Sequence, residues 1–351
     1  MNYVTLGKTG LKAAVVSFGG IPIQRADGAN TKAVVDKLEE YGINYIDTAR
    51  GYTVSEEYLG AALEGRRDKF ILATKRMSRD AASMAADVET SLRNLRTGYI
   101  DLYQLHNLPE KDIEKVFGPG GAYEALTAAR EAGKIGHIGV TAHSADALKI
   151  LVEDYADRLE TVMFPLYIVE DQGRDVLALA REKGIGTIAM KPLAGGNLDD
   201  WELALRYIAA SGVIDIMIPG MGSPAEVDRN ASVDLAAPLT AEELARCAAV
   251  RKELGPGGLA LGVFLLCTDI DDGQLVAKRV HQLQGFSRGE RAGLREFGGG
   301  GVAVCREHEN ASQEYGKPFG TKRMHSDLQG YAAVGKMPRL LFYLTLIKIL
   351  G

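Results

Sequence analysis

Four ionisable residues of different kinds end, or closely follow, consecutive apolar runs of the sequence: Asp47, Tyr52, Lys75 and His106. Hydride delivery to a carbonyl needs a proton for the developing alkoxide. A tyrosine with a pKa of ~10 holds such a proton, and a neighbouring lysine ammonium eases its release because it favours the phenolate. Asp47 would keep Lys75 charged, and His106 could donate to the carbonyl oxygen. Together these residue types predict carbonyl reduction.

Each of the four residues also has a purely structural explanation. A carboxylate at a strand end often caps a loop, a tyrosine packs, a lysine is solvated or paired, and a histidine makes local hydrogen bonds. The combination is more informative, because side chains that end adjacent strands of a barrel face one another across its mouth. No serine or cysteine stands in a recognisable nucleophile setting, which argues against hydrolysis.

The elements that must position these residues alternate regularly along the chain. Short β-rich runs are separated by segments in which apolar residues recur with helical spacing. Eight such repeats predict a (β/α)8 TIM barrel, preceded by a β-hairpin and followed by an irregular C-terminal extension. A doubly wound open sheet is the alternative, but no G-x-G-x-x-G follows the first strand. The expected strands are 15–19, 44–47, 70–75, 99–106, 137–141, 161–166, 186–191 and 215–219.

The expected barrel ends near a helix over 240–254. Thr240 and Glu243 form a capping-box pattern, and the helix places four residues near one face, namely Leu244, Cys247, Ala248 and Leu254. After Leu254 the strand–helix rhythm stops and glycine runs appear. We therefore expect a barrel domain over 1–254 and an extension of uncertain structure over 255–351.

Composition limits the possible partners. The chain has 351 residues, a formal net charge of −5 and 46% hydrophobic residues, which predicts no nucleic-acid or membrane partner. Its three cysteines are not spaced for a metal knuckle, so no metal site is expected. The N-terminus does not resemble a signal peptide, and the apolar run 340–350 is shorter than the ~20 residues of a spanning helix. We expect a cytoplasmic protein acting on a small-molecule carbonyl substrate, with its oligomeric state undetermined.

Several motifs resemble those of the aldo-keto reductase superfamily. They are INYIDTARGY (43–52), ILATK (71–75) and YIDLYQLH (99–106), and LGKTGLKAAVVSFGG (6–20) is similar to the N-terminal hairpin and first strand of that family. The resemblance runs over roughly residues 3–254 and rests on residue type, order and spacing together.

The resemblance implies a catalytic tetrad of Asp47, Tyr52, Lys75 and His106, with Tyr52 as the acid. It also implies reduction of aldehydes or ketones by NADPH or NADH, with the cofactor extended across the barrel mouth.

Cofactor contacts are expected at the ends of the later strands. A glycine pair ends the motif MKPLAGG (190–196), and Ser223 and Pro224 begin a helix whose N-terminus would attract phosphate. The alternative is that these are only tight turns. His143 and Tyr167 could face the nicotinamide, or else make local hydrogen bonds and pack in the core. By resemblance Asn230 contacts the adenine; the full set is Thr141, His143, Tyr167, Lys191, Leu193, Gly195, Gly220, Gly222, Ser223, Glu226 and Asn230.

Two features depart from the family pattern. Many members have a lysine after the strand-eight proline and an arginine on the next helix, where this chain offers Gly220, Met221 and Glu226. NADH should therefore be usable, and the preference between the two cofactors stays open. GVTAHSADAL (139–148) is closer to a subgroup with a cysteine-rich, iron–sulfur extension. Only Cys267 and Cys305 follow residue 254, and a cluster needs about four thiolates, so none is assigned.

Two other functions remain possible from the residues alone. Lys75 could act as a Schiff-base nucleophile in an aldolase, although this leaves Tyr52 and His106 without a role. The chain could also be a non-catalytic nicotinamide-binding, redox-sensing protein. The sequence does not identify the substrate.

Overall fold

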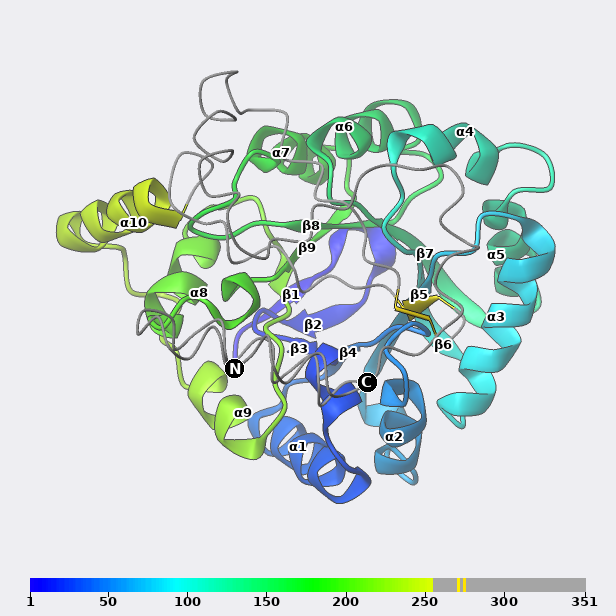
Figure 1. Ribbon diagram of the computed structural model, residues 1–351, viewed down its shortest axis with the longest axis horizontal. Coiled ribbons are helices and arrows are strands. Elements are labelled where there is room, and N and C mark those ends of the chain that lie inside the picture. Colours follow the sequence, from blue (N-terminus) through cyan, green and yellow to red (C-terminus); the bar gives the residue numbers. More distant parts are fainter. Residues whose placement is uncertain (255–269, 272–273, 276–351) are drawn as a thin grey trace, which may run out of the picture. The chain divides into compact units, whose positions relative to one another are not determined.

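The computed structural model describes residues 1–254, 270–271 and 274–275, and its centre is an eight-stranded parallel sheet in which every strand pairs with the next along the chain (Figure 1). Each of the eight predicted runs overlaps one strand, so the strand prediction is confirmed. The strands are β3 (Phe18–Gly19), β4 (Tyr45–Asp47), β5 (Ile71–Arg76), β6 (Ile100–Leu105), β7 (Ile135–Thr141), β8 (Thr161–Pro165), β9 (Gly186–Met190) and β10 (Ile216–Met217).

The first and last strands of this sheet also meet. Parallel bridges join Val16 to Met217 and Gly19 to Gly220, and the Ser17 amide donates to the Met217 oxygen at 2.8 Å. The sheet therefore closes almost completely into a barrel, which confirms the (β/α)8 prediction and excludes the open doubly wound sheet.

Helices follow the strands and surround the barrel (Figure 1). Their apolar spacing turns one face inward: on α3, for example, Met84, Val88 and Leu92 are buried, and the Asp80 side chain caps the first turn by accepting from the Ser83 amide. The helices are α1 (Gly28–Tyr41), α2 (Ser55–Ala62), α3 (Ala81–Asn94), α4 (Glu110–Phe117), α5 (Ala122–Glu131), α6 (Ala145–Asp154), α7 (Arg174–Glu182), α8 (Trp201–Ala209), α9 (Pro224–Ala231) and α10 (Ala241–Leu254), with 3-10 turns η1 (Gly7–Thr9), η2 (Ile21–Arg25), η3 (Arg67–Lys69) and η4 (Ala194–Gly196).

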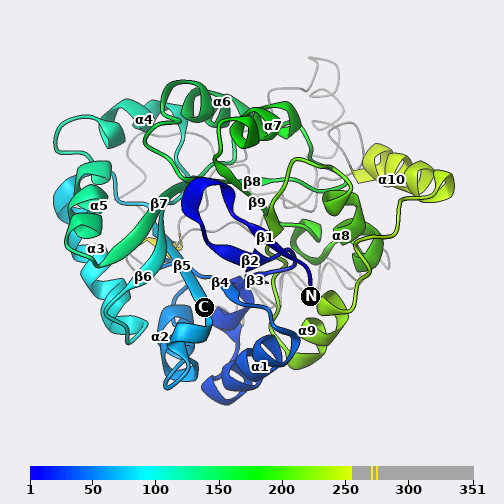
Figure 2. The ribbon, with the colours of Figure 1, turned by 180° about the vertical axis from the view of Figure 1, so that it is seen from behind.

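An antiparallel hairpin, β1 (Tyr3–Thr5) and β2 (Lys12–Ala14), crosses the end of the barrel seen in Figure 2. Leu6 and Ala13 from the hairpin pack with buried side chains from inside the barrel, including Tyr45 and Leu102. The Lys8 amide donates to the Gly184 oxygen just before β9 begins. The hairpin therefore fills the end of the barrel at which the strands start, and leaves the other end for chemistry.

The last described helix, α10, is held largely by polar contacts. The predicted capping box is confirmed, since the Thr240 amide donates to Glu243 at 2.8 Å and the Glu243 amide donates to the Thr240 hydroxyl at 3.2 Å. The expected apolar face is partly wrong: Cys247 is buried, but Leu244 and Ala248 are exposed. The spacing of apolar residues gave no sign that the helix is attached through its charged residues instead.

Two short strands, β11 (Ile270–Asp271) and β12 (Gln274–Leu275), pair antiparallel beyond α10. The remainder of the predicted extension over 255–351 lies outside the described residues. Within the described part, no helix has the length and apolar character needed to cross a membrane.

Candidate active site

The structure brings the four predicted residues together at the end of the barrel opposite the hairpin. We call Asp47, Tyr52, Lys75 and His106 the mouth cluster. The Lys75 ammonium donates to the Asp47 carboxylate and, at 2.9 Å, to the Thr48 backbone oxygen. Its nitrogen lies 4.9 Å from the centroid of the Tyr52 ring, and the Tyr52 and His106 rings meet edge to face with centroids 6.2 Å apart.

Burial and charge set the protonation of this cluster. Asp47 and Lys75 are each 2% exposed. Burial alone would lower the pKa of Lys75, but the charge of Asp47 and the contact with Tyr52 outweigh it, so that the pKa of Lys75 is raised. Burial, together with the cations Lys75, Arg76 and Arg79, holds the pKa of His106 well below its usual value. The lysine is therefore charged at neutral pH, and the histidine is neutral.

The loop between β4 and α2, which carries Tyr52, is tied to the preceding strands by buried hydrogen bonds. The Ser55 hydroxyl lies 2.9 Å from the Thr48 hydroxyl and donates to the Gly20 oxygen at 3.1 Å. The Gly20 amide in turn donates to the backbone oxygen of Asp47 at 2.7 Å. These contacts fix the start of the Tyr52 loop relative to Asp47.

Arg79 holds the backbone on the other side of the cluster. Its guanidinium donates to the backbone oxygens of His106 at 3.0 Å and Asn107 at 2.7 Å, and to the Asp112 carboxylate at 3.2 Å. The Asn107 amide donates to the Thr141 hydroxyl at 2.7 Å. The segment between β6 and α4 is thus fixed by contacts with the loop after β5 and with the end of β7.

Backbone strain gathers at the same end of the barrel. Of the five non-glycine residues with positive φ in the described part of the chain, four lie in the segments that connect a strand to the next α-helix, namely Thr53, Asn107, Lys191 and Ala194. Such conformations cost about 1–3 kcal/mol each and concentrate at functional sites. The surrounding contacts therefore maintain a geometry that these residues do not favour by themselves.

Gln104 belongs to the site and was missed by our reading of the sequence. Its side chain, fully buried inside the barrel, donates from Nε2 to the Asp47 Oδ1 at 3.2 Å. A signal was present, since residues two apart on a strand point to the same side, which puts Gln104 on the face of His106. A polar residue in an apolar strand is itself informative.

Comparison with known proteins agrees with this architecture. Residues 16–202 match the model of the aldo/keto reductase family. The chain belongs to that family. It is therefore an NAD(P)-dependent oxidoreductase, and the family's general reaction is reduction of a carbonyl group by NAD(P)H.

Three relatives show the degree of similarity. An L-galactose dehydrogenase from Arabidopsis thaliana is 27% identical over 274 residues, covering 64% of this chain and 85% of that protein. An aldo-keto reductase from Bacillus subtilis is 32% identical over 219 residues, covering 56% of this chain and 64% of that protein, which is less than two thirds of its length. The holo form of an aldo-keto reductase from Bacillus halodurans superposes with a TM-score of 0.61 at 27% identity, covering 71% of this chain and 96% of that one.

The predicted adenosine contacts of this aldo-keto reductase lie just before α9 and on it. Ser223 is the N-cap, as predicted, and its hydroxyl accepts from the Glu226 amide at 3.3 Å, while the Gly222 amide donates to the Glu226 carboxylate at 2.6 Å. The Glu226 carboxylate therefore occupies the Gly222 amide just before the N-terminus of α9. Asn230, near the end of α9, is fully buried, and neither of its amide atoms has a hydrogen-bond partner.

The glycines Gly220 and Gly222 have a packing role as well. A Cβ at Gly220 would lie 3.0 Å from the Pro22 ring, and a Cβ at Gly222 would lie 3.1 Å from it. The loops after β3 and β10 can approach this closely only because both residues lack side chains.

The remaining predicted contacts line the ends of β7, β8 and β9. The Thr141 hydroxyl accepts from Asn107, as described, and Tyr167 is 6% exposed within the hydrophobic core. Burial, with smaller effects of Lys191 and Lys75, lowers the pKa of His143 to about 3. Leu193 is buried next to η4, in which Gly195 takes a positive φ of 69°.

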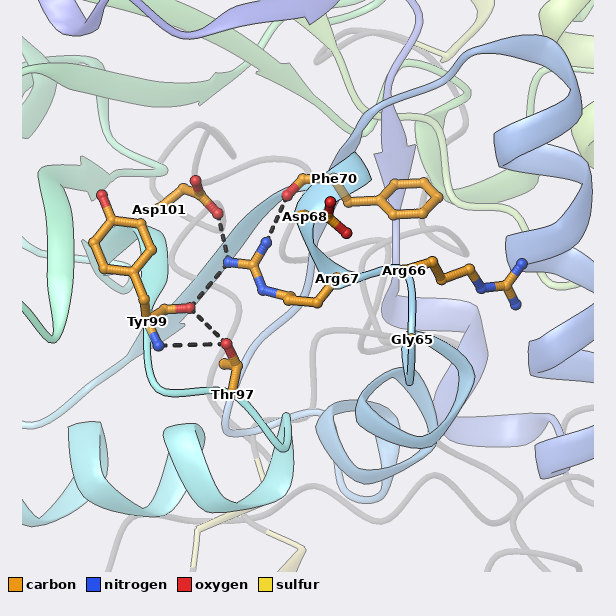
Figure 3. A pocket seen from close by; sticks show the side chains of 8 residues that line it. All are labelled: Gly65, Arg66, Arg67, Asp68, Phe70, Thr97, Tyr99 and Asp101. Carbon is orange, nitrogen blue, oxygen red and sulfur yellow. Dashed lines mark hydrogen bonds and ion pairs between the residues drawn. The ribbon is translucent and has the colours of Figure 1, made fainter.

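A pocket of about 540 Å³ lies at the end of the barrel where the strands start, next to the beginnings of β5 and β6 (Figure 3). Its central residue, Arg67, donates to the Asp101 carboxylate and to the backbone oxygens of Phe70 and Tyr99. The guanidinium charge is thus used to join the starts of two strands, and none of the four residues of the mouth cluster lines this pocket.

Proposed function

We propose that this chain transfers hydride from NAD(P)H to an aldehyde or ketone, with Tyr52 as the proton donor assisted by Lys75, Asp47 and His106. The observation that carries the proposal is the position of Lys75: its buried ammonium touches Asp47 on one side and lies against the Tyr52 ring on the other.

A bound nicotinamide cofactor would supply the hydride for the carbonyl carbon. The protein supplies the proton: the Tyr52 O–H bond breaks as the carbonyl oxygen becomes a hydroxyl. The ammonium of Lys75 stabilises the phenolate that remains. His106, which is neutral, has one N–H to donate to the carbonyl oxygen and can thereby orient the substrate.

For the cofactor we propose that Thr141, His143 and Tyr167 lie on the nicotinamide side. Lys191, Leu193 and Gly195 would lie along the pyrophosphate. The adenosine would lie against Gly220, Gly222, Ser223, Glu226 and Asn230. The unpartnered amide of Asn230 supports this placement, since one donor and one acceptor match the edge of adenine. We propose that NADH is used as well as NADPH, because Glu226 puts a carboxylate where a 2′-phosphate would be repelled.

The experiment is NAD(P)H consumption by the full chain against a panel of small aldehydes and ketones. L-Galactose and NAD⁺ are included because one relative is an L-galactose dehydrogenase. Tyr52→Phe should lower kcat at least a hundredfold, within the range of general acid catalysis. Tyr45→Phe is a matched control, because this tyrosine is buried within the barrel and its hydroxyl has no partner. Equal activity of Tyr52→Phe and wild type would refute the assignment.

The same assay separates the two alternatives. Cofactor binding without turnover of any substrate would favour a redox-sensing protein. An aldolase would be trapped by borohydride at Lys75, but this nitrogen is charged and engaged by Asp47 and Thr48, which disfavours nucleophilic attack.

A further inference from the structure

We propose that Gln104 is a positioning residue, which engages the second oxygen of the Asp47 carboxylate and thereby fixes the Lys75 ammonium against Tyr52. This inference rests on the proposed function of the mouth cluster.

The first observation is that the two oxygens of Asp47 have different partners. Lys75 donates to Oδ2 and Gln104 donates to Oδ1, at 3.2 Å, and all three residues are at most 2% exposed. A carboxylate bound on both oxygens cannot rotate without breaking one of the two contacts. The direction in which it presents Oδ2 to Lys75 is therefore determined by Gln104.

The second observation is the way in which the strands place Gln104. Lys75 and Gln104 are register partners on β5 and β6, and Gln104 pairs in turn with Gly139 on β7. A Cβ at Gly139 would come 2.1 Å from the Thr161 hydroxyl and 3.2 Å from the Gln104 Cγ, so a glycine is needed where these two side chains meet inside the barrel. Gln104 therefore shares one level of the barrel interior with the ammonium that it helps to fix.

The third observation concerns charge. Burial raises the pKa of Asp47, while the Lys75 charge and the donors from Lys75 and Gln104 oppose this effect. The titratable groups near this pair are Tyr45 on β4, Tyr52, His106 and His143. Both histidines are neutral, and among the groups that act on Asp47, Lys75 supplies the positive charge and Gln104 supplies a neutral donor that favours the ionised carboxylate.

Gln104→Met tests this role because it keeps the length of the side chain and removes the donor. In the full chain, with the cofactor that wild type prefers, we expect kcat to fall about ten- to a hundredfold, as for the loss of a hydrogen bond to a charged group. The acidic limb of the pH profile of kcat should move to higher pH, because Asp47 is then protonated more easily. The cofactor Kd should stay within about twofold.

Gln104→Glu gives a second signature. At low pH the acid form can donate to Asp47 as the amide does, but at higher pH two carboxylates cannot both ionise at this distance without repulsion. Its activity relative to wild type should therefore decrease as the pH rises, which general loosening of the barrel would not produce.

Thr161→Val is the matched control. The Thr161 hydroxyl is buried near Gly139, has no partner, and does not contact Asp47. The Thr161→Val substitution should leave kcat and the pH profile of kcat unchanged. An unshifted acidic limb in Gln104→Met, with wild type active, would overturn the role of Gln104. Absence of turnover by wild type would instead overturn the proposed function.

Discussion

Arg251, near the end of α10, donates from Nε to the backbone oxygen of Ile168 at 2.8 Å, joining segments 83 positions apart in the sequence. Its Nη2 donates to the Asp171 carboxylate at 2.9 Å and also contacts the Tyr207 hydroxyl. Ile168 directly follows Tyr167, one of the proposed nicotinamide contacts. The helix that ends the described barrel is therefore connected, through one guanidinium, to the loop that borders the proposed cofactor site.

Replacing Arg251 by alanine should destabilise the barrel by about 1.5–3 kcal/mol, because the change removes hydrogen bonds to a carboxylate and to a backbone oxygen. The measurement is chemical unfolding followed by the fluorescence of Trp201, the single tryptophan of the chain. Arg246→Ala is the control on the same helix: its ion pair with Asp200 is largely exposed and should contribute less than about 1 kcal/mol. Equal losses of unfolding free energy in the two variants would contradict the larger contribution expected of Arg251.

Arg79→Leu should lower kcat about tenfold or more while leaving cofactor affinity nearly unchanged. The substitution frees the backbone oxygens of His106 and Asn107, and a displacement near 1 Å can cost about a hundredfold in rate. Steady-state kinetics with a cofactor titration check this. Arg93→Leu, an exposed arginine on α3, should behave as wild type. A kcat within twofold of wild type for Arg79→Leu would show that the contact is not needed.

The stability of the barrel should fall as the pH decreases from 6.5 toward 3. The pKa of His143 is about 3 in the folded protein, against an ordinary value of 6.5. The unfolded chain therefore binds a proton in this interval that the folded chain does not, and stabilisation present above pH 6.5 is lost by up to ~1.4 kcal/mol per pH unit.

His143→Gln should remove the contribution of this histidine to the dependence of the free energy of unfolding on pH. Unfolding measured at several pH values between 4 and 7.5, for both proteins, gives the comparison. Identical slopes would mean that the pKa of His143 is the same in the folded and the unfolded protein.

Glu226→Gln should raise the ratio of NADPH to NADH efficiency roughly fivefold, corresponding to about 1 kcal/mol of relieved repulsion. The amide oxygen can still accept from Gly222, so the start of α9 should be preserved. Initial rates with both cofactors provide the measurement, and Glu202→Gln on α8 is the control. If the ratio is unchanged, the 2′ position of the cofactor does not lie near Glu226.

The fold and the mouth cluster were predictable because two local rules coincide. Apolar runs with helical segments between them specify parallel strands, and the carboxyl ends of such strands lie together, so Asp47, Lys75 and His106 had to converge. Ser223 as N-cap and the Thr240–Glu243 capping box were predictable for a similar reason, since both depend on residues within one helical turn.

The remaining contacts depend on segments far apart in the sequence. Nothing near Gly220 indicates that Pro22 packs against it, and nothing near Leu244 indicates that α10 is attached through Arg251. Gln104 is an intermediate case: its inward direction follows from strand periodicity, but its contact with Asp47 requires the stagger between β4 and β6.

The strained residues around the mouth bear on attempts to engineer this protein. Thr53 has a β-branched side chain at φ 42° and Lys191 lies at φ 57°, conformations that glycine adopts more easily. A selection for heat tolerance alone would find gains at such positions, by relieving the backbone. The same changes would loosen loops that hold Tyr52 and the proposed cofactor contacts, so thermostable variants from such a selection should be screened for turnover before they are combined.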